Sequence, residues 1–169
     1  MKTLALLIAM LPLSLLAEKE DVSAYKVTQV TWGEPVKGVP ASEIKPAELT
    51  GKVVIVEEFG VLTPACLQRL KELGRLRKKL DRDKSDAVII AIHRQRQVSD
   101  EDIANAVKDE RAEGVIIRKN GFLPASIGSM PHAAVFLPDG SMLWHGDSTE
   151  RDFDRKVDEA LATDAKDGP

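Results

Sequence analysis

The sequence has very little cysteine: Cys66 is the only one among its 169 residues. A single thiol cannot form an internal disulfide, and it cannot form a cysteine-rich metal site. Aromatic residues make up only 4% of the chain, and its 24 Lys and Arg are nearly balanced by 27 Asp and Glu. The resulting net charge of −3 argues against a polybasic nucleic-acid binder and against an acidic disordered chain. The 43% hydrophobic content is sufficient for the core of one domain.

Only one long apolar run is present, and it lies at residues 4–16, after Lys2 and Thr3. This run is too short for a comfortable membrane span, its basic charge lies on the N-terminal side, and Ala17 provides a small residue for cleavage. We therefore expect residues 1–17 to be a signal peptide and the protein to be exported, periplasmic or secreted, with no membrane attachment after cleavage. An uncleaved membrane anchor is the alternative.

The rest of the chain alternates strand and helix patterns, which is typical of a single α/β domain. We expect an N-terminal arm over residues 18–46 with a possible edge strand at 25–32, a domain over 47–163, and a flexible tail over 164–169. β-Branched or apolar runs predict strands at 53–56, 87–92, 115–117, 133–137 and 141–145.

Helix-start signals follow three of these strands. Thr63 is a predicted N-cap with Pro64 in the first helical position, and Gly74 is expected to weaken or kink the helix that follows. Ser99 with Asp102 forms a predicted capping box, and Ser148 or Thr149 is expected to cap the last helix.

Two stretches then resemble a known family. Residues 49–56 are followed by Thr63-Pro64-Ala65-Cys66, and Met130-Pro131-His132 precedes the predicted hairpin. These features resemble the thioredoxin superfamily, in particular exported thiol-disulfide oxidoreductases, including those that serve cytochrome maturation. The resemblance covers residues 49–161 and implies a thioredoxin-like α/β fold: a central mixed β-sheet flanked by helices, here with an N-terminal extension and a cis-proline at Pro131.

The sequence departs from this family at the position of the first motif cysteine, which is Thr63; the second motif position is Cys66. Dithiol exchange needs one thiolate to attack and a second thiol to resolve the mixed disulfide. Ordinary thioredoxin turnover is therefore excluded, and the Thr-Pro-Ala-Cys site is degenerate.

Two interpretations of Cys66 remain open. The first turn of a helix favours a thiolate, yet cysteine is also a frequent small residue of cores. Thr-x-x-Cys also resembles the peroxidatic site of peroxiredoxins, although Phe59 stands where that motif has proline. An arginine over the thiol would also be needed, and the sequence does not place any of the three candidates there: Arg94, Arg96 and Arg118.

Glu57 occupies the position of the buried acid that, in the family, moves protons to the second cysteine. A buried carboxylate has a raised pKa and can accept a proton. Its charge would also raise the pKa of the Cys66 thiol. In the alternative interpretation the strand ends early, and Glu57 and Glu58 both reach solvent around a bulge.

The histidines and the basic residues carry less information. His93, His132 and His145 are scattered, so no metal site and no cofactor are predicted. His132 follows Pro131 and could lie near Cys66, although an edge or surface position is favoured. The basic residues of the first helix indicate a solvated face that an acidic protein could also use; they are Arg69, Lys71, Arg75, Arg77, Lys78, Lys79 and Arg82.

Two classes of function follow. The favoured one is a binding module that holds a protein or peptide partner, or a thiol partner, in a groove between Cys66 and Pro131; Pro64, Met130 and His132 are the further expected binding residues. The alternative is a single-cysteine enzyme, either a peroxidase or an oxidoreductase with an external resolving thiol, with Cys66, Thr63 and Glu57 as its catalytic residues. Nucleic-acid binding is not expected. The oligomeric state is not predicted.

Overall fold

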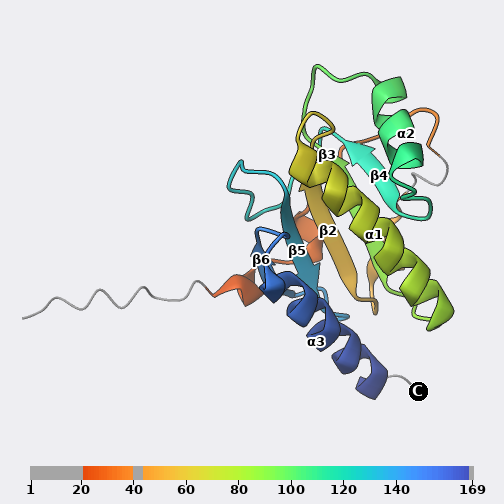
Figure 1. Ribbon diagram of the computed structural model, residues 1–169. Coiled ribbons are helices and arrows are strands. Elements are labelled where there is room, and N and C mark those ends of the chain that lie inside the picture. Colours follow the sequence, from red (N-terminus) through yellow and green to blue (C-terminus); the bar gives the residue numbers. More distant parts are fainter. Residues whose placement is uncertain (1–20, 40–43, 168–169) are drawn as a thin grey trace, which may run out of the picture.

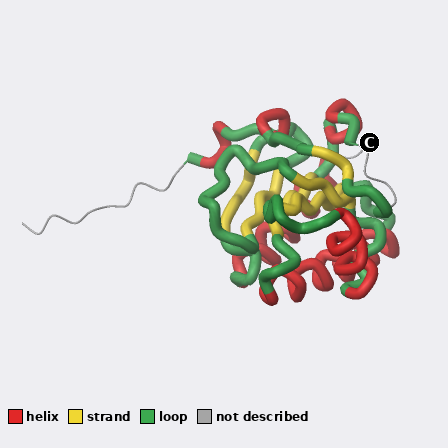
Figure 2. The backbone as a smooth tube through the Cα atoms, turned by 90° about the horizontal axis from the view of Figure 1, so that it is seen from above, coloured by secondary structure: helices red, strands yellow, loops and turns green. Residues whose placement is uncertain are grey.

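The computed structural model describes residues 21–39 and 44–167, so the predicted signal peptide at 1–17 lies outside the described residues. The described chain forms a mixed six-stranded sheet in the order β1-β4-β3-β2-β5-β6. Helices α1, α2 and α3 add their apolar faces to one side of this sheet, and Figure 2 shows the longer helices gathered there. The predicted α/β architecture is confirmed.

The central strand is β2 (Val54–Phe59), which is buried along its whole length. It runs parallel to β3 (Val88–His93) and antiparallel to β5 (His132–Phe136). β4 (Ile116–Lys119) extends the parallel side, and β6 (Met142–Gly146) closes the predicted hairpin with β5. A strand covered on both faces needs apolar residues at successive positions, which accounts for the β-branched run before Glu57.

Residues of β2 alternate between two cores. Ile55 and Phe59 belong to the core under the helices, whereas Val54 and Val56 belong to a second core on the opposite face. The second core is covered by the N-terminal arm and by residues of the loop that precedes β5. Successive strand residues point to opposite faces, so neighbouring side chains of β2 meet different surroundings.

Helix α1 (Pro64–Arg82) begins as predicted, with Thr63 at the N-cap and Pro64 in the first position. It runs unbroken past Gly74. A Cβ atom at Gly74 would lie 2.4 Å from the carbonyl oxygen of Arg111, so glycine lets the chain after α2 approach closely. α2 (Asp100–Asp109) begins at Ser99, whose hydroxyl oxygen accepts a hydrogen bond from the Asp102 amide at 3.1 Å.

The N-terminal arm packs on the sheet. Its strand is β1 (Glu34–Pro35), antiparallel to β4, whereas the predicted edge strand at 25–32 forms short 3-10 turns with isolated bridges. Gly33 has a φ of 65°, and a Cβ atom there would lie 2.0 Å from the carbonyl oxygen of Lys119. This close approach to β4 is possible only because residue 33 is glycine.

The C-terminal helix α3 (Arg151–Asp167) packs beside α1 (Figure 1). It begins at Arg151, later than the predicted caps at Ser148 or Thr149, and it continues to Asp167, although a tail was expected from residue 164. Residues 168–169 lie outside the described residues. Within the described ranges, none of the helices combines the length and apolar content needed to span a membrane.

Candidate functional site

The start of α1 hides the thiol of Cys66. Cys66 is the third residue of the helix and is 0% exposed, and its amide donates to the Thr63 carbonyl oxygen at 2.9 Å. Thr63 holds the N-cap position without a side-chain capping hydrogen bond, and Pro64 and Ala65 are exposed. The motif therefore exposes Pro64 and Ala65, leaves Thr63 half-buried and keeps the sulfur in the core.

Glu57 and Glu58 are both buried, at 0% and 1% exposure. β2 continues without a register shift to Phe59, so the alternative of an early strand end with two solvated acids is wrong. Because the two residues are adjacent in a strand, their carboxylates lie on opposite faces of the sheet. Each has its own arginine partner.

On the helix face, the partner of Glu57 is Arg69 of α1. An Arg69 guanidinium nitrogen lies 3.1 Å from Glu57 Oε2, and the Arg69 side chain is only 7% exposed. The guanidinium also donates to Glu72 at 2.6 Å and to Ser148 Oγ at 3.2 Å, and it stacks over the Phe153 ring. The interpretation of the basic helix face as solvated is thus wrong for Arg69.

Burial and charge have opposite effects on Glu57. Burial raises the pKa of the Glu57 carboxyl, whereas the adjacent charge of Arg69 and its hydrogen bond lower it. One carboxylate oxygen, Oε1, is buried without a hydrogen-bond partner among the described residues.

The same environment disfavours a thiolate at Cys66. Burial raises the pKa of the thiol, the negative charge of Glu57 raises it further, and nearby hydrogen bonds from the Gly60 backbone and Thr63 side chain act in the opposite direction. The net direction is upward, although the sulfur lies in the first turn of a helix. Desolvation therefore outweighs the favourable N-terminal position, and the thiol form is favoured at neutral pH.

On the opposite face, Glu58 fixes the loop that precedes Pro131. Its carboxylate accepts hydrogen bonds from the Leu123 amide at 3.0 Å and the Ser126 hydroxyl at 2.6 Å, and it pairs with the guanidinium of Arg94. The sequence patterns did not predict this cluster. The pattern that could have indicated it is Glu58 on an otherwise apolar strand, together with Arg94 directly after the neighbouring strand.

The Met130–Pro131 peptide bond is cis, and Pro131 is buried while Met130 is half-buried. β5 begins at His132, which pairs in register with Glu58. Pro131 therefore lies at the end of the strands where β2 runs into residues 60–63, and the motif lies at the same end. This end of the strands, and not an outer strand, is the edge that carries Thr63 and Pro131.

His132 is fully buried, so its expected surface position is wrong. Its pairing with Glu58 places it on the face opposite to Glu57, and its ring lies 5.4 Å from that of His145. Burial lowers the pKa of His132. The described part of the chain contains no group of three or more His, Cys, Asp or Glu residues that could hold a metal ion.

Exposed apolar side chains flank this edge. Leu62, directly before the motif, is 64% exposed, and Ile127, in the loop before Pro131, is 67% exposed. Leu62 lies between β2 and the motif, and Ile127 follows Ser126, whose hydroxyl donates to Glu58.

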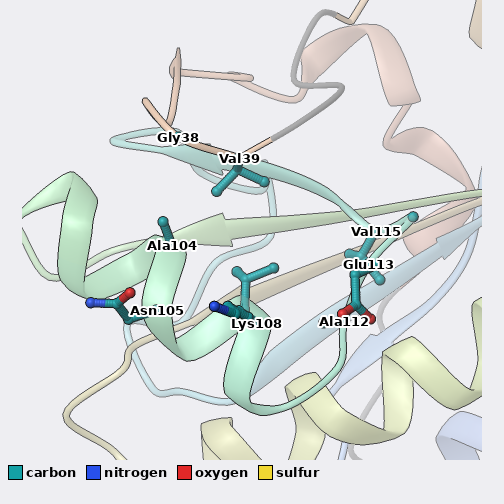
Figure 3. Close-up of a pocket in the computed structure, with 10 residues that line it drawn as sticks. Gly38, Val39, Ala104, Asn105, Lys108, Ala112, Glu113 and Val115 are labelled. Atoms are coloured by element: carbon teal, nitrogen blue, oxygen red, sulfur yellow. The ribbon is translucent and has the colours of Figure 1, made fainter.

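A separate hollow of about 360 Å³ lies between the N-terminal arm and α2 (Figure 3). Gly38 and Val39 form one wall, and α2 and residues 112–115 form the other. It contains none of the predicted site residues.

A scan against protein-family models gives no match, and a search of curated proteins gives none either. Solved structures do match. A thiol-disulfide isomerase from Corynebacterium glutamicum superimposes with a TM-score of 0.61 at 17% identity, covering 78% of this chain and 96% of that one. A thioredoxin family thiol:disulfide interchange protein from Chlorobium tepidum gives 0.58 at 22% identity, covering 78% and 93%.

The fold is thioredoxin-like. A secreted disulfide oxidoreductase from Mycobacterium tuberculosis shares it with a TM-score of 0.57 at 11% identity, covering 79% of this chain and 94% of that one. Identities this low show the shared fold, and the chemistry has to be argued from the residues at the edge that carries Thr63 and Pro131.

Proposed function

We propose that this chain is an exported thioredoxin-like protein with a degenerate Thr-Pro-Ala-Cys site, which binds a peptide or thiol-bearing partner and does not perform dithiol exchange. The observation that carries the proposal is the state of Cys66. It is the only thiol of the sequence, it is fully buried, and its pKa is raised. A nucleophilic cysteine needs the opposite: an accessible sulfur and a stabilised thiolate.

The edge that carries Thr63 and Pro131 supports the binding role. The exposed Pro64, the half-buried Met130 and the exposed Leu62 and Ile127 provide apolar contacts there. Backbone next to a buried proline can pair with an extended peptide, which is a form of strand addition. Binding of this kind needs no thiol chemistry.

Export is part of the proposal. It is supported by the signal-like residues 1–17 and by the secreted M. tuberculosis oxidoreductase that shares the fold.

Peroxide chemistry has less support. Arg94 pairs with Glu58 across the sheet from Glu57, and Arg118 donates to the backbone carbonyl of Gly33 in the arm. Arg69 lies on the helix face with Cys66, but it is engaged by Glu57 and Glu72.

A thiol-trapping experiment tests the binding surface. The double variant Thr63→Cys, Cys66→Ser places one thiol at the half-buried first position of the motif. An extended peptide with one cysteine activated as a mixed disulfide with thionitrobenzoate serves as probe; attack by the introduced thiolate forms the protein–peptide disulfide and releases thionitrobenzoate. We expect this thiol to react faster with the peptide than with the activated disulfide of free cysteine.

The matched control is Gln68→Cys, Cys66→Ser, which places the thiol on an exposed position of α1, one helical turn or more from the motif's first residue. It is expected to show no preference for the peptide. An equal ratio of the two rates at positions 63 and 68 would contradict peptide binding at the edge beside Pro131.

A further inference from the structure

A second hollow borders the motif on the side of α2. It has a volume of about 410 Å³ and is bounded by residues 61–62, the first turn of α1, the segment before α2, and α2 itself. Its apolar lining comprises Val61, Leu62, Leu67, Val98 and Ala106. We call it the α2 groove. The largely exposed Leu62 gives the rim of the groove an apolar surface that an apolar group of a partner could cover.

The groove also has an acidic side. Asp102 and Asp109 line it from α2, and Glu110, the C-cap of that helix, lines it beside them. They stand at relative positions 0, 7 and 8 of the helix and so share one face, whereas Ile103 and Val107 are buried in the core.

These three carboxylates differ from the acid at the start of the same helix. Asp100 pairs with Lys119 at 2.6 Å, but none of the three forms an ion pair with a residue in the described ranges. The α2 groove therefore combines an apolar floor with three negative charges that the described chain does not neutralise.

We propose that the α2 groove docks a segment of a protein partner in which apolar side chains are flanked by lysine or arginine. The apolar side chains would cover Leu62 and Leu67 and remove their surface from water. The long stems of the basic residues would pack along the rim while their charged ends reach the carboxylates. This surface goes beyond the proposed function, since it lies between α2 and the start of α1 and requires neither Cys66 nor Pro131; Leu62 borders both surfaces.

A peptide-binding experiment on the full chain tests this. The probe is a fluorescein-labelled peptide of about twelve residues with paired leucines between lysines, followed by fluorescence anisotropy; a control peptide carries glutamate in place of lysine. We expect the lysine peptide to bind, its affinity to fall with added salt, and the glutamate peptide not to bind.

Variants locate the site. Asp102→Asn, Asp109→Asn, Glu110→Gln together are expected to weaken binding about tenfold or more. The matched set Asp83→Asn, Asp86→Asn, Glu101→Gln changes the charge equally at exposed positions outside the groove and should leave affinity within about twofold. Leu62→Ser, at an exposed position that folding does not need, should weaken binding as the acidic variants do.

Several results would overturn the inference. They are absence of binding to the wild type, equal losses from both sets of acid variants, or self-association of the chain that the groove variants abolish. Loss of binding on Ile127→Ser, with no loss on the triple variant of the groove acids, would assign the peptide to the edge beside Pro131, which would leave the proposed function standing and reject the α2 groove. If the thiol trap fails while the lysine peptide still binds as expected, the α2 groove stands and the proposed function is rejected.

Discussion

At the scale of single residues, the pair Arg69 and Glu57 defines the surroundings of the thiol. The side chains are 7% and 0% exposed, so both charges have lost their hydration. A buried pair gains little net stability over an apolar replacement, but removing one partner leaves the other charge uncompensated. The pair therefore holds the Glu57 carboxylate in the core beneath the start of α1. There its negative charge raises the pKa of the Cys66 thiol and opposes the thiolate that the helix N-terminus would favour.

Arg69→Met is expected to lower the free energy of unfolding by about 3–5 kcal/mol, because it leaves Glu57 buried and unpaired. Adding Glu57→Gln should recover a large part of that loss. Urea denaturation measures both. The exposed Arg75→Met on the same helix, as control, should change stability by less than about 0.5 kcal/mol; equal effects at positions 69 and 75 would show that the buried pair carries no such role.

His93 predicts a pH dependence of stability. It is buried beside Phe59, and burial lowers its pKa to about 4. The folded state therefore holds His93 neutral, while the unfolded chain takes up a proton below about pH 6.5. This contribution to stability is complete above pH 6.5 and is lost as pH falls toward 4.

The loss due to His93 is expected to reach about 3 kcal/mol at pH 4. The measurement compares the pH dependence of the free energy of unfolding of the wild type with that of His93→Gln, because carboxyl groups contribute to both. The variant should lose less stability between pH 7 and pH 4. Parallel curves would show that His93 is not held neutral.

At the scale of elements, β2 separates the two faces of the sheet, and its consecutive acids Glu57 and Glu58 bind residues on opposite faces. Glu57 is tied to α1, whereas Glu58 holds residues 121–129 in place ahead of Pro131. The exposed Ile127 belongs to that held loop. The conformation of one wall of the proposed binding edge therefore depends on a residue from the opposite side of the central strand.

Glu58→Gln is expected to loosen residues 121–129, because the ion pair with Arg94 is lost and one hydrogen-bond acceptor is replaced by a donor. Hydrogen exchange at the Leu123 amide should become at least about tenfold faster. Arg94→Met should act in the same direction, and the exposed Arg96→Met should not. Unchanged protection of Leu123 in Glu58→Gln would contradict the role of Glu58.

Local signals in the sequence predicted much of this architecture. Pro64 at the start of α1, the Ser99 capping hydrogen bond and the hairpin of β5 and β6 depend on neighbours within a few residues. The pairing of β1 with β4, and the partners of Glu58 and Arg69, depend on contacts between residues far apart in the chain. An isolated helix pattern could not show that one arginine of a basic face points into the core.

At the scale of the whole molecule, the thioredoxin-like sheet brings the start of α1 and Pro131 to one edge whatever the thiol content of the motif. Fold and activity are separable for this reason. Here the half-buried Thr63 stands at the first position of the motif, and the remaining sulfur is enclosed beside a carboxylate. The fold is shared with solved thiol-disulfide oxidoreductases, and the function proposed for this edge is binding.

The rate of Cys66 alkylation by iodoacetamide as a function of pH, in the native protein, tests whether the thiol is buried and unreactive. We expect slow alkylation at pH 7, a midpoint above the ordinary thiol value of about 8.5, and fast alkylation once urea unfolds the chain. The exposed thiol of Gln68→Cys, Cys66→Ser provides the reference rate. Fast alkylation of native Cys66 with a midpoint well below 8.5 would contradict the proposed binding function and assign the protein to the single-cysteine enzymes.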